Sequence, residues 1–528
     1  MGLRRPLVVG LLAATALCAC TVGPSFKRPD TPAPAAYIGH NESVSREPAA
    51  ATANDFEQHI VLGATPAANW WQLFQSQPLD ELIRQTAANN HTLAAAFATL
   101  AKSQELVVAQ SGARYPQVSA DAGAGRQKYG AQFLGPSPIP PFSYLAAGAT
   151  VHYLLDYTGG VARSVEQSQA LAQYQQSEVE ATYLALTGNV AMQAMAIAST
   201  RAQIQAVNDL LAEDRENLNL VGTAFDNGSV SKLDVLTAQS QLASDETLLP
   251  PLYHQRALAR HALTVLVGQT PADWSPPDFT LDQLKLPREL PVSLPSELVH
   301  RRPDILAAEA QLHAATAAVG IATSNLYPQI TLTATGSQQA LGNQGSQLFD
   351  HSASAWSLIA GLTAPIFDGG TLRAERRAAI DELHASAERY QQTVLESFGQ
   401  VADLLDALSQ DAMSLSTQTR ALATAESGLE LARESYSAGN SGLLQLLDSQ
   451  RQRQQAELGF VRAQAQQYLD TTQLFLALGG SGLLEPDMSM EREMKHAPQS
   501  SFEVVNYRET LHQHSADCSN KPPRIKCW

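Results

Sequence analysis

The sequence predicts an α+β membrane protein: a trimeric 12-stranded transmembrane β-barrel, with four strands per chain, that continues into a long coiled-coil α-helical barrel. Three observations predict this fold class. The 528 residues contain an internal duplication with an offset of about 211 residues. Each repeat holds two alternating segments long enough to cross a bilayer. Each also holds a heptad-patterned helix that is too long for a compact domain.

Residues 1–19 have the pattern of a bacterial lipoprotein signal peptide. Two arginines precede an apolar run from Leu7 to Leu17, which is too short to span a bilayer. The segment Leu17-Cys18-Ala19-Cys20 resembles a lipobox, so Cys20 is the candidate for acylation and for the first mature residue. Thr21, by resemblance to lipoprotein sorting, favours the outer membrane. The alternative is an ordinary signal peptide with incidental cysteines.

The duplication is visible in four motifs that recur at nearly one offset. Tyr115-Pro116-Gln117-Val118 returns as Tyr327-Pro328-Gln329-Ile330, and 327 minus 115 is 212. The other pairs are residues 159–160 with 369–370, 225–228 with 436–439, and 265–268 with 476–479, at offsets of 210 or 211. Four agreeing motifs indicate one architecture used twice.

Each repeat is expected to begin with a helix followed by two strands. From Leu79 to about Gly112 the apolar residues follow helical spacing, which predicts one helix. In the second repeat the pattern alternates at Ile330, Leu332 and Ala334, and again from Trp356 to Ile366. The matching segments 118–130 and 144–157 alternate less cleanly, so their prediction rests on the duplication. The connectors beginning at 135 and 342 are turn-rich and are expected to be loops outside the cell.

The long helices carry a seven-residue repeat. The apolar heptad positions are Tyr183, Val190, Ile197, Ile204, Leu211, Leu218 and Phe225, and then Ile380, Ala387, Val394, Val401, Leu408, Leu415, Leu422, Leu429 and Tyr436. Such a repeat predicts supercoiled packing, and a helix of about 60 residues is on the order of 90 Å long. Each helix is expected to turn and return as a second helix. Pro250 and Pro251 must kink or break the first return helix.

The strand count predicts the oligomer. Four strands cannot close a barrel, and open strand edges cannot lie in lipid. Two chains would give eight strands with a filled interior, whereas three chains would give twelve strands with room for a pore. After the signal, no uninterrupted apolar run reaches the roughly 18 to 20 residues of a spanning helix. We therefore expect a homotrimer that crosses the membrane with strands.

Composition excludes several classes of function. The net charge is -16, from 35 Lys and Arg against 51 Asp and Glu, which argues against a nucleic-acid partner. The 13 histidines show no paired ligand spacing, and there is no phosphate loop, nucleophile elbow or zinc helix. We expect no enzyme activity, no cofactor and no metal site. Cys518 and Cys527 lie in a polar tail, where a disulfide and free thiols are both open.

Several motifs together resemble one protein family. Residues 20–26 with Pro29 look like the mature start of TolC-like outer-membrane efflux lipoproteins of the NodT-type branch. Trp70-Trp71 with Phe74 resembles the next landmark of that family. Residues 301–305 and the following helix to Tyr327-Pro328 resemble its second-repeat opening. The resemblance runs from Cys20 to about residue 480.

The resemblance implies a function and partners. A member of this family is a passive exit duct for small molecules, a trimer whose barrel lies in the outer membrane and whose helical tunnel crosses the periplasm. A periplasmic adaptor joins it to an inner-membrane pump, here expected to be of RND type, and Cys20 would bind outer-membrane lipid. The alternatives are a structural periplasm-spanning lipoprotein and a type I protein-secretion duct. The exported substrate is not predicted.

The expected organisation follows the repeats. The chain divides into a signal peptide (1–19), an acylated N-terminal segment (20–78), a first repeat (79–268), a Pro-rich equatorial linker (269–300), a second repeat (301–480) and a polar tail (481–528).

The candidate site residues lie where each long helix turns back. Asp234 and Asp448 are the candidates for a periplasmic gate. The candidates for adaptor docking are Asn227, Gly228, Ser229, Gly439, Asn440 and Ser441. Each has a plainer alternative, because an acid in a first helical turn is favoured by the helix dipole and glycine permits the positive φ of a turn. Arg301 and Arg302 are expected to begin a helix and meet neighbouring acids.

Overall fold

The computed structural model describes residues 21–30, 34, 37, 58–67, 69–128, 140–342 and 345–480. All of them belong to one unit, Met1–Gly482, and the second unit, Leu483–Trp528, lies outside the described residues. Cys20, Cys518, Cys527 and the predicted outer loop at 135–138 also lie outside them.

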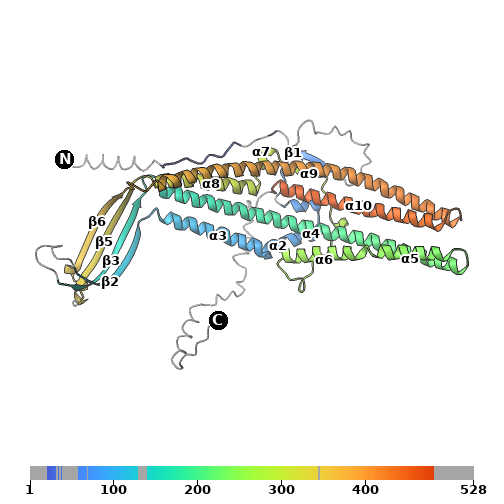
Figure 1. Cartoon of the computed structure of the whole chain (residues 1–528), viewed down its shortest axis with the longest axis horizontal. Helices are drawn as coiled ribbons and strands as arrows, with labels where there is room; N and C mark the ends of the chain where they lie inside the picture. Colours follow the sequence, from blue (N-terminus) through green and yellow to red (C-terminus); the bar gives the residue numbers. More distant parts are fainter. Residues whose placement is uncertain are drawn as a thin grey trace, which may run out of the picture. The chain divides into compact units, whose positions relative to one another are not determined.

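The two repeats fold into the same order of elements (Figure 1). The first consists of α2 (Gln77–Asn89), α3 (His91–Gly112), β2 (Gln117–Gln127), β3 (Phe142–Leu155), α4 (Gly160–Asp226), α5 (Lys232–Glu246) and α6 (Leu249–Leu266). The second consists of α8 (Pro303–Ser324), β5 (Gln329–Leu341), β6 (Ser354–Thr363), α9 (Thr371–Ser437) and α10 (Leu443–Ala477). The predicted order of helix, two strands and helical hairpin is confirmed in the second repeat, and the first repeat follows it from its strands onward.

The predicted single helix from Leu79 to Gly112 is wrong, because the chain divides there into α2 and α3. Asn90 leaves the helical region with ψ of 121° and acts as the N-cap of α3, where its side chain accepts a hydrogen bond from the backbone N–H of Leu93 at 2.9 Å. A capping asparagine satisfies a free N–H group of a new helix, which compensates for breaking the old one.

The return helices differ as the prolines predict. In the first repeat α5 ends at Glu246 and α6 begins at Leu249, with Pro250 and Pro251 in its first turn. Proline is tolerated there because the first N–H groups of a helix have no partner within it. In the second repeat α10 runs without interruption for 35 residues.

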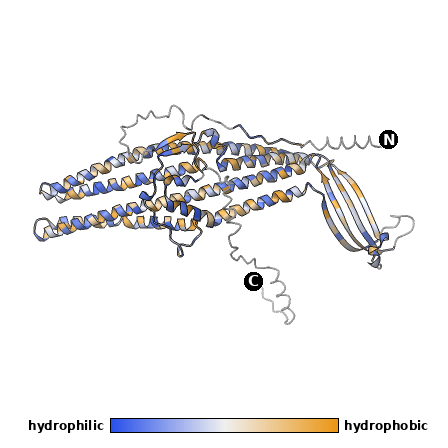
Figure 2. Ribbon diagram, turned by 180° about the vertical axis from the view of Figure 1, so that it is seen from behind, coloured by the Kyte–Doolittle hydropathy of each residue, from blue (hydrophilic) through white to orange (hydrophobic). Residues whose placement is uncertain are grey.

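The four strands form one antiparallel sheet in the order β2-β3-β5-β6. The register gives the sheet two chemically different faces. Four successive cross-strand rows on one face are wholly apolar: Leu362-Ile330-Leu155, Ala360-Leu332-Tyr153, Leu358-Ala334-Val151-Val118 and Trp356-Gly336-Ala149-Ala120. The opposite face is mixed but mainly polar: it carries Ser119, Asp121, Thr150, His152, Thr331, Thr333, Thr335 and Ser357, together with Leu154 and Ile359. Figure 2 shows the hydrophobic segments along these strands.

The apolar face is uncovered in the single chain. On β6, the strand at one edge of the sheet, Trp356 is 79% exposed and Leu358 73% exposed. The predicted strand ends earlier than expected, at Thr363, and Ile366 beyond it is fully exposed. An apolar patch of this kind marks a surface made for lipid or protein.

The heptad prediction is confirmed by burial. Val190, Ile197 and Val401 are completely buried, and most other heptad residues are buried or half-buried. Phe225, at the end of the first series, is the exposed one, and the ammonium of Lys232 lies 5.3 Å from its ring centroid. α4 packs against α3, α6, α8 and α10, whereas α9 packs against α8 and α10.

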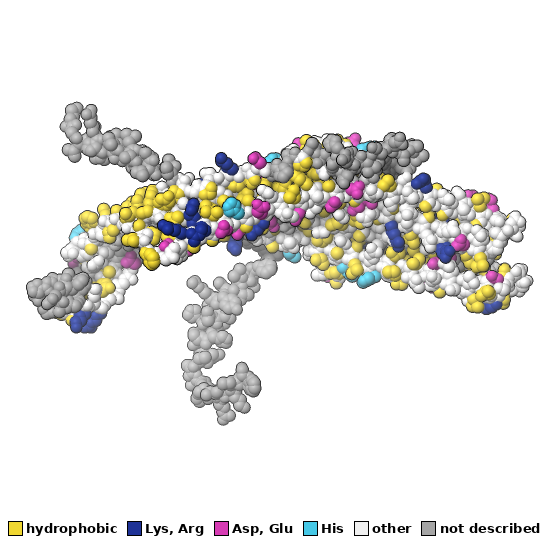
Figure 3. All heavy atoms as spheres, turned by 45° about the horizontal axis from the view of Figure 1, so that its top comes forward, with side chains coloured by type: hydrophobic (Ala, Val, Ile, Leu, Met, Phe, Trp, Pro, Cys, Tyr) yellow, Lys and Arg dark blue, Asp and Glu magenta, His cyan; other side chains and the backbone are white. Residues whose placement is uncertain are grey.

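The main core lies around the middle of the long helices. The short helix η1 (Trp70–Phe74) inserts three aromatic side chains, and the rings of Trp70 and Phe475 stack at 5.7 Å. Nearby, β1 (His59–Leu62) pairs in parallel with β4 (Glu289–Val292), which is followed by α7 (Pro295–Leu298). In Figure 3 hydrophobic side chains gather over the helical part next to the sheet, while other side chains dominate toward the hairpin turns.

Within the described residues one helix, α8, is long and apolar enough by length and composition to cross a membrane. Its sequence includes Asp304 and Glu309, so it is not an uninterrupted apolar run. Half of its apolar stretch is buried, and it packs against α4 and α9. It therefore serves as a core helix of this fold.

Candidate functional site

The first described residues of the chain are fixed where the sheet meets the long helices. The backbone N–H of Val22 donates to the carbonyl of Thr158 at 2.9 Å, just after β3 ends. Gly159 has a φ of +77°, and a Cβ atom on it would lie 2.6 Å from the Thr21 side chain. Cys20, the lipidation candidate, precedes Thr21 directly and lies outside the described residues.

This junction also needs two glycines that touch. A Cβ on Gly23, whose φ is +89°, would lie 2.6 Å from the Cα of Gly320 in α8. A Cβ on Gly320 would in turn meet the Arg163 side chain of α4 at 2.8 Å. Glycine is thus required for the N-terminal segment to pass this close to both helices.

An ion pair between a buried arginine and a half-buried glutamate lies at the same junction. Arg163 is 4% exposed and donates to Glu166 at 2.6 Å, while the Nε2 of His313 lies 3.0 Å from the other oxygen of Glu166. Burial would raise the pKa of Glu166, but the hydrogen bonds from Arg163 and His313 outweigh it and lower that pKa. The His313 ring stacks on Phe26 at 4.4 Å, so the N-terminal segment closes over this cluster.

The first hairpin turn is built from exposed polar residues. Asn227, Gly228 and Ser229 are all exposed, and Gly228 has a φ of +73°. Asp234 belongs to a capping box: its carboxylate accepts the backbone N–H of Ser231 at 2.8 Å, and Ser231 caps the N–H of Asp234. The hydrogen bonds from the Ser231 side chain and backbone lower the pKa of Asp234.

The second hairpin turn has the same outline. Gly439 has a φ of +73° and is exposed together with Asn440, while Ser441 is half-buried and its hydroxyl has no hydrogen-bond partner. Asp448 lies in the second turn of α10, where it accepts from Arg451 at 2.5 Å and from Gln452 at 2.7 Å. The two gate candidates thus bind partners within their own hairpins, and no hydrogen bond or ion pair described here joins Asp234 to Asp448.

Sequence reasoning missed the contacts that join the two hairpins. Glu213 on α4 lies 3.1 Å from Arg433 on α9 and 3.9 Å from Arg453 on α10. Asn217 on α4 donates to Gln450 on α10 at 2.6 Å in a buried position. Polar residues at buried helix positions were the only signal, and their partners lie more than 200 residues away along the chain.

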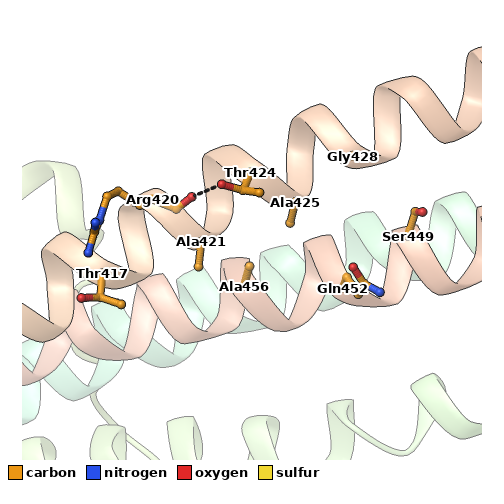
Figure 4. A pocket seen from close by; sticks show the side chains of 9 residues that line it. All are labelled: Thr417, Arg420, Ala421, Thr424, Ala425, Gly428, Ser449, Gln452 and Ala456. Atoms are coloured by element: carbon orange, nitrogen blue, oxygen red, sulfur yellow. Dashed lines mark hydrogen bonds between the residues drawn. The ribbon is translucent and has the colours of Figure 1, made fainter.

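An open groove of about 650 Å³ runs between α9 and α10 close to this region (Figure 4). Small and polar side chains line it: Thr417, Arg420, Ala421, Thr424, Ala425, Gly428, Ser449, Gln452 and Ala456. The Thr424 hydroxyl donates to the carbonyl of Arg420 at 2.8 Å, so it is turned back onto its own helix. The sequence analysis did not single out these residues.

The expectation for Arg302 is confirmed. Its side chain is nearly buried at the start of α8 and donates to Asp304 at 2.6 Å. It also donates to the carbonyl of Ala477 at 2.8 Å and to Gln400 at 2.9 Å. The arginine therefore joins α8 to the last turn of α10 and to α9.

Among the described residues there is no group of three or more His, Cys, Asp or Glu side chains arranged to hold a metal ion. The candidate functional features of the described residues are the exposed hairpin turns and the sheet with its two different faces.

Comparison with known proteins gives a consistent result. The model of the outer membrane efflux protein family matches the chain twice, at residues 82–269 and 294–480, which agrees with the internal duplication. The pyoverdine export outer membrane protein OpmQ of Pseudomonas aeruginosa is 32% identical over 435 residues, which cover 80% of this chain and 90% of OpmQ. The outer membrane protein OprJ of the same organism is 29% identical over 487 residues, covering 90% and 97% of the two chains.

Solved structures share the fold. The outer-membrane channel OprN superimposes with a TM-score of 0.79 at 27% identity, covering 88% of this chain and 99% of OprN. VceC from Vibrio cholerae gives a TM-score of 0.72 at 25% identity, covering 79% of this chain and 99% of VceC.

Proposed function

Because the chain belongs to the outer membrane efflux protein family, we propose that three copies of it form the passive exit duct of a tripartite efflux system. The cargo we assign is a small molecule handed over by an inner-membrane pump. The related protein OpmQ exports pyoverdine, as its name states.

The two-faced sheet carries this proposal. Its apolar rows suit contact with lipid tails and its polar face suits a water-filled lumen. In the described chain β2 and β6 each pair on one side only, and open strand edges are not tolerated in a bilayer. Three copies joined β2 to β6 would satisfy every edge in a 12-stranded barrel, a size that leaves a pore.

The helices supply the second half of a duct. α4 and α9 each contain 67 residues, and at 1.5 Å per residue each spans about 100 Å. A helix of that length reaches far into the periplasm from an outer-membrane barrel. Residues 79–268 and 301–480 then act as two halves of one wall, joined by the linker 269–300.

Planar-bilayer recording tests the proposal directly. The purified full chain should form ion-conducting channels. In cells, deletion of its gene should raise the sensitivity to exported toxic compounds. A structural periplasm-spanning lipoprotein would do neither. A type I secretion duct would conduct ions, but its deletion would abolish the export of a protein and leave small-molecule sensitivity unchanged.

We assign an acyl anchor to Cys20. Thr21 and Val22 are fixed at the end of β3, where the strands leave the proposed membrane, so a lipid on the preceding residue would enter the adjacent leaflet. Cys20→Ala should abolish labelling with radioactive palmitate, whereas Cys18→Ala should leave labelling intact. Labelling that persists in Cys20→Ala would contradict the assignment of the acyl anchor to Cys20.

We assign the hairpin turns to docking of the periplasmic adaptor, which joins the duct to a pump of RND type. Exposed turns at the ends of the long helices are the parts that reach farthest from the sheet (Figure 1). A photoreactive crosslinker at Ser229 or Ser441 should capture the adaptor in cells. The same crosslinker at exposed Ser354 on the sheet is the control, and equal capture from both places would contradict the assignment.

Asp448 is our stronger gate candidate, because Asp234 already has a complete capping role in the first turn of α5. Asp448→Asn should lower cation selectivity and weaken block by multivalent cations in single-channel recordings. Asp234→Asn serves as the matched control. If Asp448→Asn conducts and is blocked like the parent, the gating role is lost while the duct proposal stands.

A further inference from the structure

Both helical hairpins contain a pair of facing aspartates that the duct proposal does not use. In the first hairpin Asp214 on α4 faces Asp245 on α5, and they are 4% and 7% exposed. In the second, half-buried Asp411 on α9 faces Asp470 on α10, which is 8% exposed. Two ionised carboxylates this close and this buried would repel each other strongly.

The hydrogen bonds around the two pairs follow one plan. On each return helix a glutamine four residues before the aspartate donates its amide to that carboxylate: Gln241 to Asp245 at 2.8 Å, and Gln466 to Asp470 at 3.0 Å. On each long helix the Oδ2 atom of the aspartate is buried without any partner. The aspartate on each return helix therefore receives a hydrogen bond that stabilises its ionised form. The aspartate on each long helix receives no hydrogen bond at its Oδ2 atom.

A single proton completes each arrangement. With a proton on the long-helix aspartate, its O–H donates to the facing carboxylate and the pair carries one negative charge instead of two. Burial and the facing acid raise the pKa of Asp214 to about 7. Burial and Asp470 raise the pKa of Asp411 to about 7 as well.

The neighbouring charges do not remove the need for that proton. On α4, Glu213 adds to the repulsion on Asp214, and Arg215 opposes it only from outside, where it pairs with Glu246 of α5. Arg433 of α9 and Arg453 of α10 are both engaged by Glu213. At the second pair the titratable group that acts on Asp411 is Asp470, and Arg462 of α10 donates to Gln203 instead.

The duplication did not copy this arrangement from one repeat to the other. At the offset of 211, the positions of Asp214 and Asp245 become Ala425 and Ala456, and those of Asp411 and Asp470 become Thr200 and Ala259. The second pair also lies about twice as many residues from its hairpin turn as the first. The same pairing of aspartates thus occurs at two positions along the hairpins that the duplication does not relate.

We propose that Asp214-Asp245 and Asp411-Asp470 are two proton-binding sites, each of which holds one proton between the two helices of a hairpin. With the proton bound, each hairpin is tied together across its helices; without it, two buried negative charges push the helices apart. The sites act in the described helices whether or not the chain conducts, so this inference does not depend on the proposed duct.

The sign of the pH effect follows from linkage. Because the pKa values of Asp214 and Asp411 are raised above the unfolded value of about 3.9, the folded state holds more protons than the unfolded state between about pH 4 and pH 7. Stability therefore falls as pH rises through this window and reaches its lower level above about pH 7. Acidification of the periplasm tightens both hairpins.

Infrared spectroscopy of the purified full chain in detergent tests the proposal. The protonated-carboxyl C=O band should be present at pH 6 and should decrease by pH 8. Asp214→Asn and Asp411→Asn should each remove about half of that change, and the double variant should abolish it. Asp209→Asn is the matched control, because Asp209 also accepts from a glutamine four residues earlier on α4 but is exposed.

Thermal unfolding provides a second readout. The midpoint of the parent should rise between pH 8 and pH 6, and the double variant should show a flat midpoint near or above that of the parent at pH 8. A band or a rise that survives in the double variant would overturn the proposal. So would a midpoint at pH 8 that depends on Mg²⁺ or Ca²⁺ and loses this dependence in the variants, because a metal ion would then be the ligand.

Discussion

The two long helices α4 and α9 are equally long and related by the duplication, yet their environments differ. Of the 67 residues in each, 26 are buried in α4 and nine in α9. α4 packs against helices from both repeats, whereas α9 makes most of its helix contacts with α8 and α10 of its own repeat. Duplication has therefore reproduced the element and its heptad register, while the surroundings of each copy were set by its place in the assembled chain.

This difference identifies where the single chain is incomplete. A helix that keeps an apolar heptad stripe and leaves much of its remaining surface small and polar is suited to a neighbour of the same kind. The exposed side of α9 and the open edge of β6, the strand that precedes α9, both belong to the second repeat. The trimer proposed above would cover both.

The largest expected effect compares equivalent heptad leucines. Leu211 on α4 is 1% exposed, and Leu422, at the offset of 211, is half-buried on α9. In the separated chain, Leu211→Ala should lower the free energy of unfolding by about 2 to 5 kcal/mol, and Leu422→Ala by clearly less. Urea unfolding of each variant measures this, and equal losses would show that the exposed side of α9 is covered in the assembled protein.

A second comparison concerns the joint that closes each repeat. Asn90 donates to the carbonyl of Leu266 at 2.8 Å, and Arg302 donates to that of Ala477 at 2.8 Å. These carbonyls are related by 477 minus 266, or 211. The two repeats thus bind equivalent carbonyl groups with different side chains: a neutral asparagine in the first repeat and a buried arginine in the second.

Removing the joint should cost more in the second repeat. Arg302→Ala leaves the Ala477 carbonyl and Gln400 without their donor and should destabilise by about 1 to 3 kcal/mol. Asn90→Ala removes a cap and should destabilise by about 0.5 to 2 kcal/mol. Thermal unfolding of both variants checks the order. The reverse order would mean that the hydrogen bonds of Asn90 stabilise the fold more than those of Arg302 do.

The smallest expected effect lies at the helix starts. The lowered pKa of Glu166 means that its contribution to stability is present above the unfolded value of about 4.3 and is lost as pH falls through the lower folded value. Glu166→Gln should therefore destabilise at pH 7 by less than about 1 kcal/mol, and should reduce the loss seen on acidification below about pH 4. The equivalent residue on α9, Arg377, is exposed, so Arg377→Gln should change neither.

Elements were predictable where a pattern is local and repeated. The heptads of α4 and α9, the break at Pro250 and Pro251, and the strands of the second repeat follow from spacing alone. The strands of the first repeat, rich in alanine and glycine, were found through the duplication. The boundary between α2 and α3 was missed because apolar spacing continues across Asn90, and only the capping role of that residue reveals the break.

The candidate sites were less predictable, because they depend on contacts between distant parts of the chain. Turn residues such as Gly228 and Gly439 follow from their composition. The bond from Asn217 to Gln450 and the facing aspartates require knowledge of which helix faces lie together. In the sequence, the signal for these contacts is a polar residue at a buried position of a heptad helix, and this signal does not indicate which residue is the partner.

The contact between Gly23 and Gly320 has a consequence for the order of folding. Residues 21–23 touch the start of α4, from the first repeat, and α8, from the second. They cannot take this position until both repeats are in place. Residues 21–23 precede both repeats in the chain, and they are thus among the last to reach their final position, which closes only on a completed protomer.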